Sequence, residues 1–295
     1  MADSGLAELD REYYRNANPD LQSLALEELE QHYLTFGIHE GRASSHAARR
    51  EGLIEMLGES ASVLEIGPFL NPVMRGRRVR YFDVLDTAGL KARAAIQNYR
   101  YSDAPEIDYV SPAGDLSIVK DRFASLVSAH CIEHQPDIVR HLRQAGGLLQ
   151  PGGRYYLIVP DKRYCFDHFI AESTVAGMID AYSEERRIHR LASVIEHRAL
   201  TTHNDPARHW NGDHTDTGYI DSIPQRTRAA MAEYAAAGGA YVDVHAWQFT
   251  PASFRHTMTT LSRLGLSPFD VTAVHGTPRP RNEFTAILAR KGTSG

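Results

Sequence analysis

The segment from His203 to His214, HNDPARHWNGDH, gathers histidine and aspartate side chains within a few residues of one another. Imidazole and carboxylate groups together can ligate a divalent metal such as Mg or Mn, which acidifies a hydroxyl. They can also form a metal-free base in which a carboxylate orients a histidine. A solvated loop in which Asp and Asn make turns has the same composition, so all three interpretations stay open. The candidate metal ligands and catalytic groups are His203, Asp205, His209, Asp213 and His214.

The spacing within this segment matches no compact metal motif such as H-E-x-x-H. Pro206 is tolerated only in the first turn of a helix and Gly212 would end one soon after, so Asp205 and His209 share a helical face only briefly. Metal ligands here would therefore be gathered by loop geometry. Trp210 would either stack on a ring of a bound molecule or anchor the loop in the core.

A further histidine, His245, lies in the run AYVDVHAWQFTP, where apolar and polar residues roughly alternate. Alternation places Val242 and Val244 on one side and Asp243 and His245 on the other. His245 is therefore a further candidate catalytic residue, and the alternative is a partly buried histidine with its hydrogen bonds satisfied.

The elements that must position these residues follow an alternating pattern. Strands are predicted over 62–67, 79–86, near 109, 123–129 and 154–160, and helices over about 47–58, 87–97 and 137–149. After residue 160 the alternation of strands and helices stops, and helices are expected near 171–200 and 224–237. The alternation resumes with a helix that has Thr250 as N-cap and Pro251 at its first position, followed by two final strands. The sequence predicts an α/β fold, a doubly wound Rossmann-like sheet with a C-terminal antiparallel hairpin and one insertion.

The end of the first strand is where a ligand is expected, because open α/β sheets bind ligands beyond the carboxyl ends of their strands. The sequence there reads EIGPFLNP, with Glu65, then Gly67 and Pro68 in a tight turn that includes Asn71. Asp83, near the end of the second strand, suits hydrogen bonds to ribose hydroxyls. The loop lacks the glycines and the lysine of a phosphate cradle, which favours a nucleoside ligand without a pyrophosphate.

Several motifs over residues 60–161 resemble those of one family in order and spacing: VLEIGPFLNP, YFDVLD, GDLSIV, LVSAHCIEHQPD and LLQPGGRYYLIVPD. They are similar to the successive motifs of class I S-adenosylmethionine-dependent methyltransferases of the kind found in bacterial glycan and natural-product biosynthesis. The resemblance implies a seven-stranded methyltransferase sheet and S-adenosylmethionine as cofactor. The loop departs from the family's E-x-G-x-G-x-G at Phe69 and Asn71.

The resemblance also implies residue roles. Glu65 and Gly67 would line the methionine side of the cofactor, with Pro68 and Asn71 in the same loop, and Asp83 would hold the ribose. The adenine would meet Asp115 and Leu116, while His130 would border the methyl-transfer site with His134 close to the cofactor. For Asp83 the alternative is a cap of the next helix, a place for which Asp86 competes. For Glu133 and His134 the alternative is local capping of the QPD turn.

The insertion over 161–249 is expected, by the same resemblance, to form a lid above the reactive end of the cofactor. The predicted reaction is methyl transfer to a hydroxyl, with a histidine base or a divalent metal, on a small-molecule or glycan acceptor. Nitrogen and carboxylate acceptors are the alternatives. A catalytically inactive binding protein and a metal-dependent hydrolase are the other classes considered.

Residues 1–45 are predicted to be a helical N-terminal appendage to a methyltransferase domain over 46–295. Part of this appendage, YYRNANPDL to HYLTFGIHEGR, resembles a helical module found beside domains of bacterial surface-glycan proteins, which favours a sugar acceptor. The alternative is a packing or oligomerisation element, so a homo-oligomer stays open.

Charge and composition indicate which kinds of partner and which cellular compartment to expect. A net charge of -5 gives no basic surface for a nucleic acid. The N-terminus lacks the pattern of a signal peptide and no apolar run is long enough for a membrane span, so we expect a cytoplasmic protein without a membrane partner. The two cysteines, Cys131 and Cys165, are expected to be buried free thiols.

Overall fold

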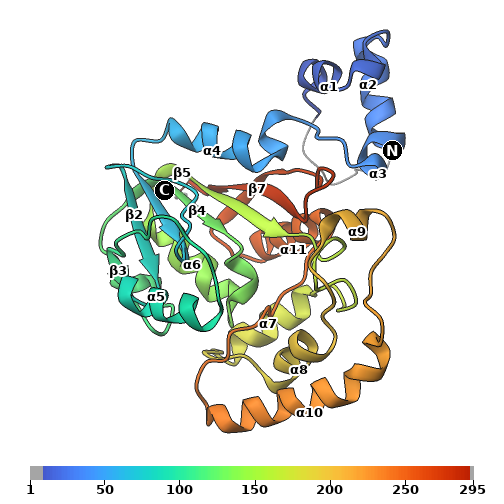
Figure 1. Cartoon of the computed structure of the whole chain (residues 1–295). Coiled ribbons are helices and arrows are strands. Elements are labelled where there is room, and N and C mark those ends of the chain that lie inside the picture. Colours follow the sequence, from blue (N-terminus) through green and yellow to red (C-terminus); the bar gives the residue numbers. More distant parts are fainter. Residues whose placement is uncertain (1–8, 293–295) are drawn as a thin grey trace.

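A computed structural model describes residues 9–292, and a seven-stranded sheet of order β3-β2-β1-β4-β5-β7-β6 forms its centre (Figure 1). The strands are β1 (Val63–Ile66), β2 (Val79–Asp83), β3 (Tyr109–Val110), β4 (Phe123–Ala129), β5 (Leu149–Pro160), β6 (Phe269–Val274) and β7 (Glu283–Arg290). The strands from β3 to β5 pair in parallel, and β7 is antiparallel to both β5 and β6. The predicted doubly wound sheet with a closing antiparallel hairpin is therefore confirmed.

Helices cover both faces of the sheet. Helix α4 (Arg50–Gly58) packs on one face, while α6 (Ile138–Leu148), α7 (Val175–Ser183) and α11 (Pro251–Arg263) contribute to the core on the other (Figure 1). Because side chains alternate along a strand, Val63 of β1 contacts the α4 side and Leu64 the opposite side. This burial on both faces explains why apolar side chains occupy adjacent positions of β1, at Val63, Leu64 and Ile66. Thr250 caps α11 as predicted, accepting from the backbone N–H of Ser253 at 3.3 Å.

The insertion departs from the prediction in two places. The stretch expected to be helical over 171–200 forms two helices, α7 and α8 (Leu191–Ala199), separated by a turn at Glu185, whose φ is +50°. Helix α10 (Tyr219–Ala237) begins five residues before Pro224, although proline normally marks a helix start. The buried Tyr219, whose hydroxyl donates to the carbonyl of Leu200 at 2.7 Å, anchors this extra turn.

Residues 11–40 form a separate helical cluster at the upper right of Figure 1. Its elements are α1 (Arg11–Ala17), η1 (Pro19–Leu21), α2 (Leu26–His32), η2 (Tyr33–Gly37) and α3 (Ile38–Glu40). Tyr14, Leu21, Leu29 and Tyr33 give them a small core of their own. The division of the chain at residue 45 stays a prediction.

Helix α5 (Thr87–Ile96) buries Leu90 and Ala94. The remaining elements are short: η3 (His46–Ala48), η4 (Leu116–Ile118), η5 (Ile132–His134) and α9 (Pro206–Trp210). Among the helices of residues 9–292, none has the length and apolar character that crossing a membrane requires.

Candidate active site

The sheet changes direction between β1 and β4: the chain runs outward from β1 to β2 and β3 on one side, and from β4 to β5 on the other. Ligands of doubly wound sheets bind at such a switch point, beyond the carboxyl ends of the strands. The two strand ends touch here, because a Cβ built on Gly67 would lie 2.8 Å from the Sγ of Cys131. The candidate site is therefore framed by the loop after β1 and the turn after β4.

Gly67→Ala is expected to lower the free energy of unfolding by about 1–3 kcal/mol, because the added Cβ would clash with Cys131. The backbone also opposes the change, since the φ of Gly67 is +69°. Urea denaturation measures the loss. Gly58→Ala is the matched control, because no atom of the described residues lies within 4 Å of a Cβ built at Gly58. A wild-type midpoint for Gly67→Ala would contradict the prediction.

Two buried carboxylates hold the loop after β1. Glu65 accepts from the backbone N–H groups of Val73 at 2.7 Å and Met74 at 3.2 Å, and burial raises its pKa to about 7. Asp83 accepts from the N–H of Phe69 at 3.2 Å, and burial raises its pKa above the ordinary value. Asp83 thus lies at the end of β2, where the sequence places it, and supports the same loop.

The side chains that replace the family's glycines pack away from the strand ends. The ring of Phe69 meets that of Tyr99 edge to face, with centroids 5.0 Å apart, and the amide of Asn71 donates to the hydroxyl of Tyr99 at 2.8 Å. Pro68 is buried beside them. Phe69 nevertheless has the left-handed φ of +49° that favours glycine, so the loop keeps a glycine-like path.

The groups predicted to meet adenine face one side chain of α6. The amide nitrogen of Gln144 donates to Asp115 at 2.6 Å, and its amide oxygen accepts from the N–H of Leu116 at 3.3 Å. The hydrogen bonds from Ser117 and Gln144 lower the pKa of Asp115. The amide of Gln144 thus presents one donor and one acceptor to Asp115 and Leu116, as the exposed edge of an adenine does. A bound adenine would take these two hydrogen bonds and displace the side chain of Gln144.

The turn after β4 carries an unusual carboxylate. Glu133 is fully buried, and neither of its side-chain oxygens has a hydrogen-bond partner among residues 9–292. Its Oε1 lies 3.9 Å from Nδ1 of His130, 4.0 Å from Nε2 of His134 and 3.8 Å from Nε2 of His245. We refer to these four residues as the Glu133 cluster.

Each histidine of the Glu133 cluster is bound to a second carboxylate through its other ring nitrogen. The partners are Glu283 for His130 at 2.7 Å, Asp243 for His134 at 2.9 Å and Asp167 for His245 at 2.6 Å. Every ring is thereby oriented with one nitrogen toward Glu133.

Burial and charge act differently on these histidines. Burial lowers the pKa of His245 to about 3, so its ring is neutral at pH 7. Burial also opposes charge on His134, but the hydrogen bond to Asp243 and the charge of Glu133 raise its pKa above the ordinary value.

The C-terminal part of the insertion packs against the turn after β4. The backbone N–H groups of Ala246 and Trp247 both donate to the carbonyl of Glu133, at 2.8 and 3.2 Å. The indole of Trp247 donates to the carbonyl of Gln135 at 2.6 Å, and the N–H of His245 donates to the ring of His197 at 3.1 Å. These contacts place the insertion at the carboxyl end of β4.

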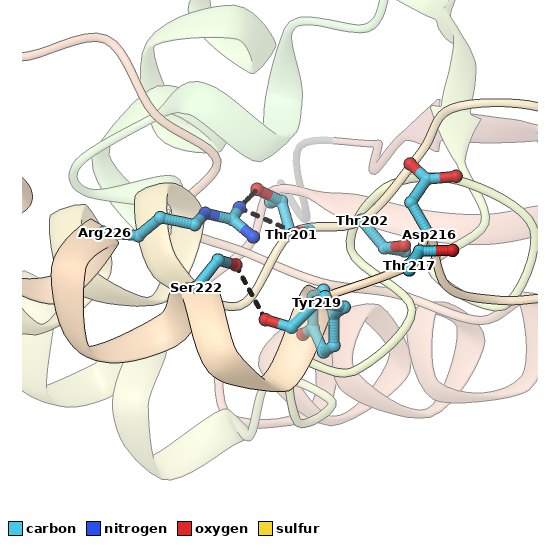
Figure 2. Close-up of a pocket in the computed structure, with 8 residues that line it drawn as sticks. Thr201, Thr202, Asp216, Thr217, Tyr219, Ser222 and Arg226 are labelled. Atoms are coloured by element: carbon cyan, nitrogen blue, oxygen red, sulfur yellow. Dashed lines mark hydrogen bonds between the residues drawn. The ribbon is translucent and has the colours of Figure 1, made fainter.

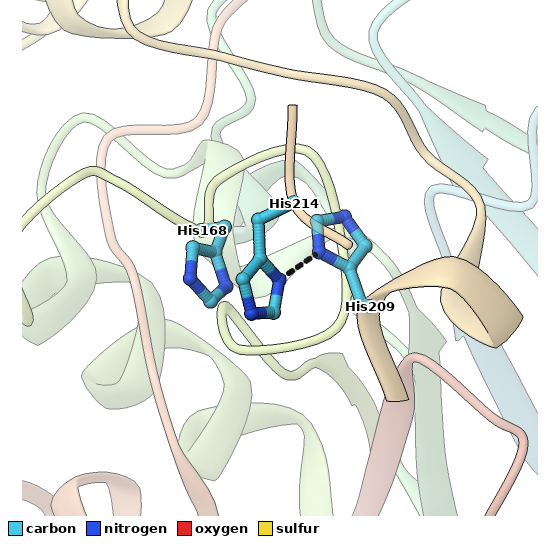
Figure 3. A group of neighbouring side chains, drawn as sticks. All are labelled: His168, His209 and His214. Atoms are coloured by element: carbon cyan, nitrogen blue, oxygen red, sulfur yellow. Dashed lines mark hydrogen bonds between the residues drawn. The ribbon is translucent and has the colours of Figure 1, made fainter. Parts of the chain in front are cut away.

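The histidine-rich segment forms a second group, which we call the lid histidines: His168, His209 and His214 (Figure 3). Nδ1 of His209 lies 3.0 Å from Nδ1 of His214, whose ring stacks on that of His168. Nε2 of His209 faces the carbonyl of His203 at 3.1 Å, so both of its ring nitrogens are occupied. Burial lowers the pKa of His209 to about 4.

The other residues predicted in this segment have structural partners. Asp205 caps α9 and accepts from the N–H groups of Ala207 and Arg208, and Asp213 pairs with Arg208 at 2.7 Å. The ring of His203 contacts the carbonyl of Asp213 at 3.1 Å. The structure therefore gathers His209 and His214 with His168, which sequence reasoning missed, and leaves the remaining predicted ligands outside the group.

Trp210 anchors the loop rather than facing an open site. It stacks on Tyr164 with ring centroids 3.7 Å apart, and its indole donates to the carbonyl of Arg281 at 2.8 Å.

A cavity of about 280 Å³ lies in the insertion near His214 (Figure 2). Thr202, one of its lining residues, donates to the carbonyl of His214 at 2.6 Å. Arg226 crosses one side of the cavity and donates to Thr201, and Ser222 donates to the carbonyl of Tyr219. None of the lining residues belongs to the Glu133 cluster. Its hydroxyl-rich wall suits a polar molecule.

The comparisons with known proteins find likeness in structure only. No protein-family model and no curated protein matches the sequence. One similar structure is the CurJ carbon methyltransferase, at 13% identity and a TM-score of 0.38, covering 82% of this chain and 53% of that chain. Another is the magnesium protoporphyrin IX methyltransferase ChlM from Synechocystis PCC 6803 with bound SAH, at 10% identity and a TM-score of 0.36, covering 82% of each chain.

The glycopeptide N-methyltransferase MtfA complexed with sinefungin is a third, at 19% identity and a TM-score of 0.29, covering 38% of this chain and 49% of that chain. The chain thus spans about half the length of the CurJ and MtfA chains. The strand order and the antiparallel β7 are those of the class I methyltransferase fold, which confirms the resemblance found in the sequence at the level of the fold.

Proposed function

We propose that the protein transfers a methyl group from S-adenosylmethionine to a hydroxyl oxygen of a sugar or another small polar acceptor. The observation that carries this proposal is the contact between Gly67 and Cys131, which places the loop after β1 beside the turn that bears the Glu133 cluster. A cofactor loop and a polar, imidazole-rich site are thus adjacent.

The residues at the switch point fit the cofactor. Gly67 lets the loop after β1 pass closely against Cys131, beside which the methionine end would lie. Asp83 offers a carboxylate at the end of β2 for the ribose, and Asp115 with the N–H of Leu116 presents the pattern that an adenine edge satisfies. When bound, S-adenosylmethionine supplies a methyl group on a sulfonium, ready for a single displacement.

His130 is the base that we favour. Its side chain is 35% exposed, against 27% for His134 and 6% for His245, so it is the most accessible imidazole of the Glu133 cluster. Glu283 orients its ring through Nε2 and is itself paired with Arg50 at 2.6 Å. The acceptor's O–H bond breaks as its oxygen bonds to the methyl carbon, the carbon–sulfur bond breaks with its electron pair left on sulfur, and the proton passes to Nδ1 of His130.

A polar acceptor is supported by the imidazole and carboxylate groups of the Glu133 cluster, beside which the acceptor would lie. Nitrogen and carboxylate acceptors need less help from a base, and a binding protein without activity needs none. A screen of polar acceptors, with mass spectrometry to detect the gain of one methyl group and its position, distinguishes these outcomes.

Asp83→Ala is expected to weaken the binding of S-adenosylmethionine by about tenfold or more, because the ribose loses a charge-assisted hydrogen bond. Calorimetric titration measures the affinity. Asp86→Ala is the matched control, since Asp86 caps α5 by accepting from the N–H of Gly89 at 2.7 Å. No binding by the wild-type protein, or wild-type affinity in Asp83→Ala, would overturn the cofactor assignment.

A further inference from the structure

The carboxylate of Glu133 is buried without the partners that a buried charge requires. Burying an ionised carboxylate is costly unless it is paired or ligates a metal. Within the described residues, both oxygens lack a hydrogen-bond partner, and the surrounding nitrogens lie at 3.8–4.0 Å, too far for hydrogen bonds.

These separations suit ligands of one metal ion. Two atoms bound to the same ion lie at most about 4.2 Å apart, twice a zinc–nitrogen bond of about 2.1 Å. Glu133, His134 and His245 each offer one ligand atom, and these three atoms lie within 4.8 Å of one another, so a small inward shift of the side chains brings all three to bonding distance.

The outer partners of the two histidines support this arrangement. Nδ1 of His134 is bound to Asp243 and Nδ1 of His245 to Asp167, which leaves both Nε2 atoms facing Glu133. Metal-binding histidines typically donate their other N–H to a carboxylate, which fixes the tautomer and the ring orientation. Here two histidines from distant segments both have this support.

The lid histidines lack such an arrangement. Both ring nitrogens of His209 are occupied, by His214 and by a backbone carbonyl, and the group contains no carboxylate. Of the two histidine groups, the Glu133 cluster is therefore the better metal site.

We propose that Glu133, His134 and His245 bind a divalent transition-metal ion. Two imidazoles and one carboxylate on one side of the ion favour zinc, iron, cobalt or nickel over magnesium and leave coordination positions open. If the proposed methyl transfer is correct, an acceptor oxygen bound at an open position would lie beside His130, its base; the metal site itself does not depend on that function.

Cobalt titration of the full-length, metal-stripped protein tests the site. We expect one Co²⁺ per chain, visible absorption that reports nitrogen and oxygen ligands, and displacement by Zn²⁺. Glu133→Gln, which keeps the side-chain shape, should weaken binding by about 100-fold or more, and Asp243→Asn, which removes an outer partner, by about 10- to 100-fold. His209→Gln should bind as the wild type does. Circular dichroism checks the folding of each variant.

The proposal is overturned if the wild-type protein binds neither Co²⁺ nor Zn²⁺, if Glu133→Gln and Asp243→Asn both bind as the wild type does, or if His209→Gln alone loses the metal. Should Glu133→Gln fail to fold, Asp243→Asn and the nitrogen ligand count from X-ray absorption of the wild type still decide. Calorimetry with S-adenosylmethionine in the presence of a chelator is run in parallel. If the protein binds S-adenosylmethionine but no metal, the metal site alone is rejected. If it binds the metal but not S-adenosylmethionine, the proposed function alone is rejected.

Discussion

His130→Asn is expected to lower the rate of methyl transfer by about 100-fold or more, while the affinity for S-adenosylmethionine stays within about threefold. Nδ1 of His130 is the imidazole nitrogen that we assign to the acceptor proton, and asparagine has no basic nitrogen to replace it. The effect should therefore fall on kcat with a hydroxyl acceptor.

Asparagine is the substitution of choice because the backbone at His130 is left-handed, with a φ of +49°. Asparagine tolerates that conformation better than most residues, so the turn after β4 should fold unchanged. His209→Gln is the matched control, since it removes an imidazole from the lid histidines. An unchanged rate in His130→Asn, with a 100-fold loss in His209→Gln, would assign the reaction to the lid histidines instead.

The fold could be predicted because its signals are local. The apolar run of β1 and the glycine turns that follow strands reflect burial on both faces and sharp chain reversal, and both are properties of a few adjacent residues. The predicted start of α10 at residue 224 was wrong because a contact between distant residues decides where this helix begins. Pro224 is a local stop signal, but a tertiary contact of Tyr219 with the carbonyl of Leu200 stabilises a turn of helix before it.

The site could be predicted only in part. The family resemblance singled out His130 and His134, and the alternating pattern of its neighbours singled out His245. Their convergence on Glu133 was not foreseeable, since it joins β4 to a segment more than a hundred residues later, as the contact between His134 and Asp243 shows. Asp167, in the run CFDHF, carries no spacing signal at all.

Stability is expected to fall by several kcal/mol between pH 7 and pH 5. Burial lowers the pKa of six histidines to about 3 or 4: His141, His189, His197, His209, His245 and His275. In the unfolded chain a histidine titrates near 6.5, so below that pH the unfolded state takes up protons that the folded state refuses. The folded state then loses about 1.4 kcal/mol per pH unit for each such histidine.

Buried carboxylates act in the opposite direction. Burial raises the pKa of Glu65 to about 7 and those of Asp137 and Asp167 to about 6, so the folded state holds protons there that the unfolded state releases. Their contribution to stability grows as the pH falls toward 4. Asp83 and Glu196, whose pKa values burial also raises, act in the same way. Because the six histidines still outnumber these carboxylates, the net effect of acidification near pH 5 is a loss of stability. A domain stable by about 5–15 kcal/mol at neutral pH would approach unfolding there.

His141→Gln isolates one of these histidines. Nε2 of His141 lies 3.0 Å from the buried hydroxyl of Tyr155, a contact that a glutamine amide can keep without titrating. The free energy of unfolding, measured in urea at pH 7, 6 and 5, should fall less steeply in this variant, by about 1.4 kcal/mol per pH unit below pH 6.5. His39→Gln, at an exposed position, should keep the wild-type slope. An unchanged slope in His141→Gln would mean that this ring takes up its proton without unfolding the core.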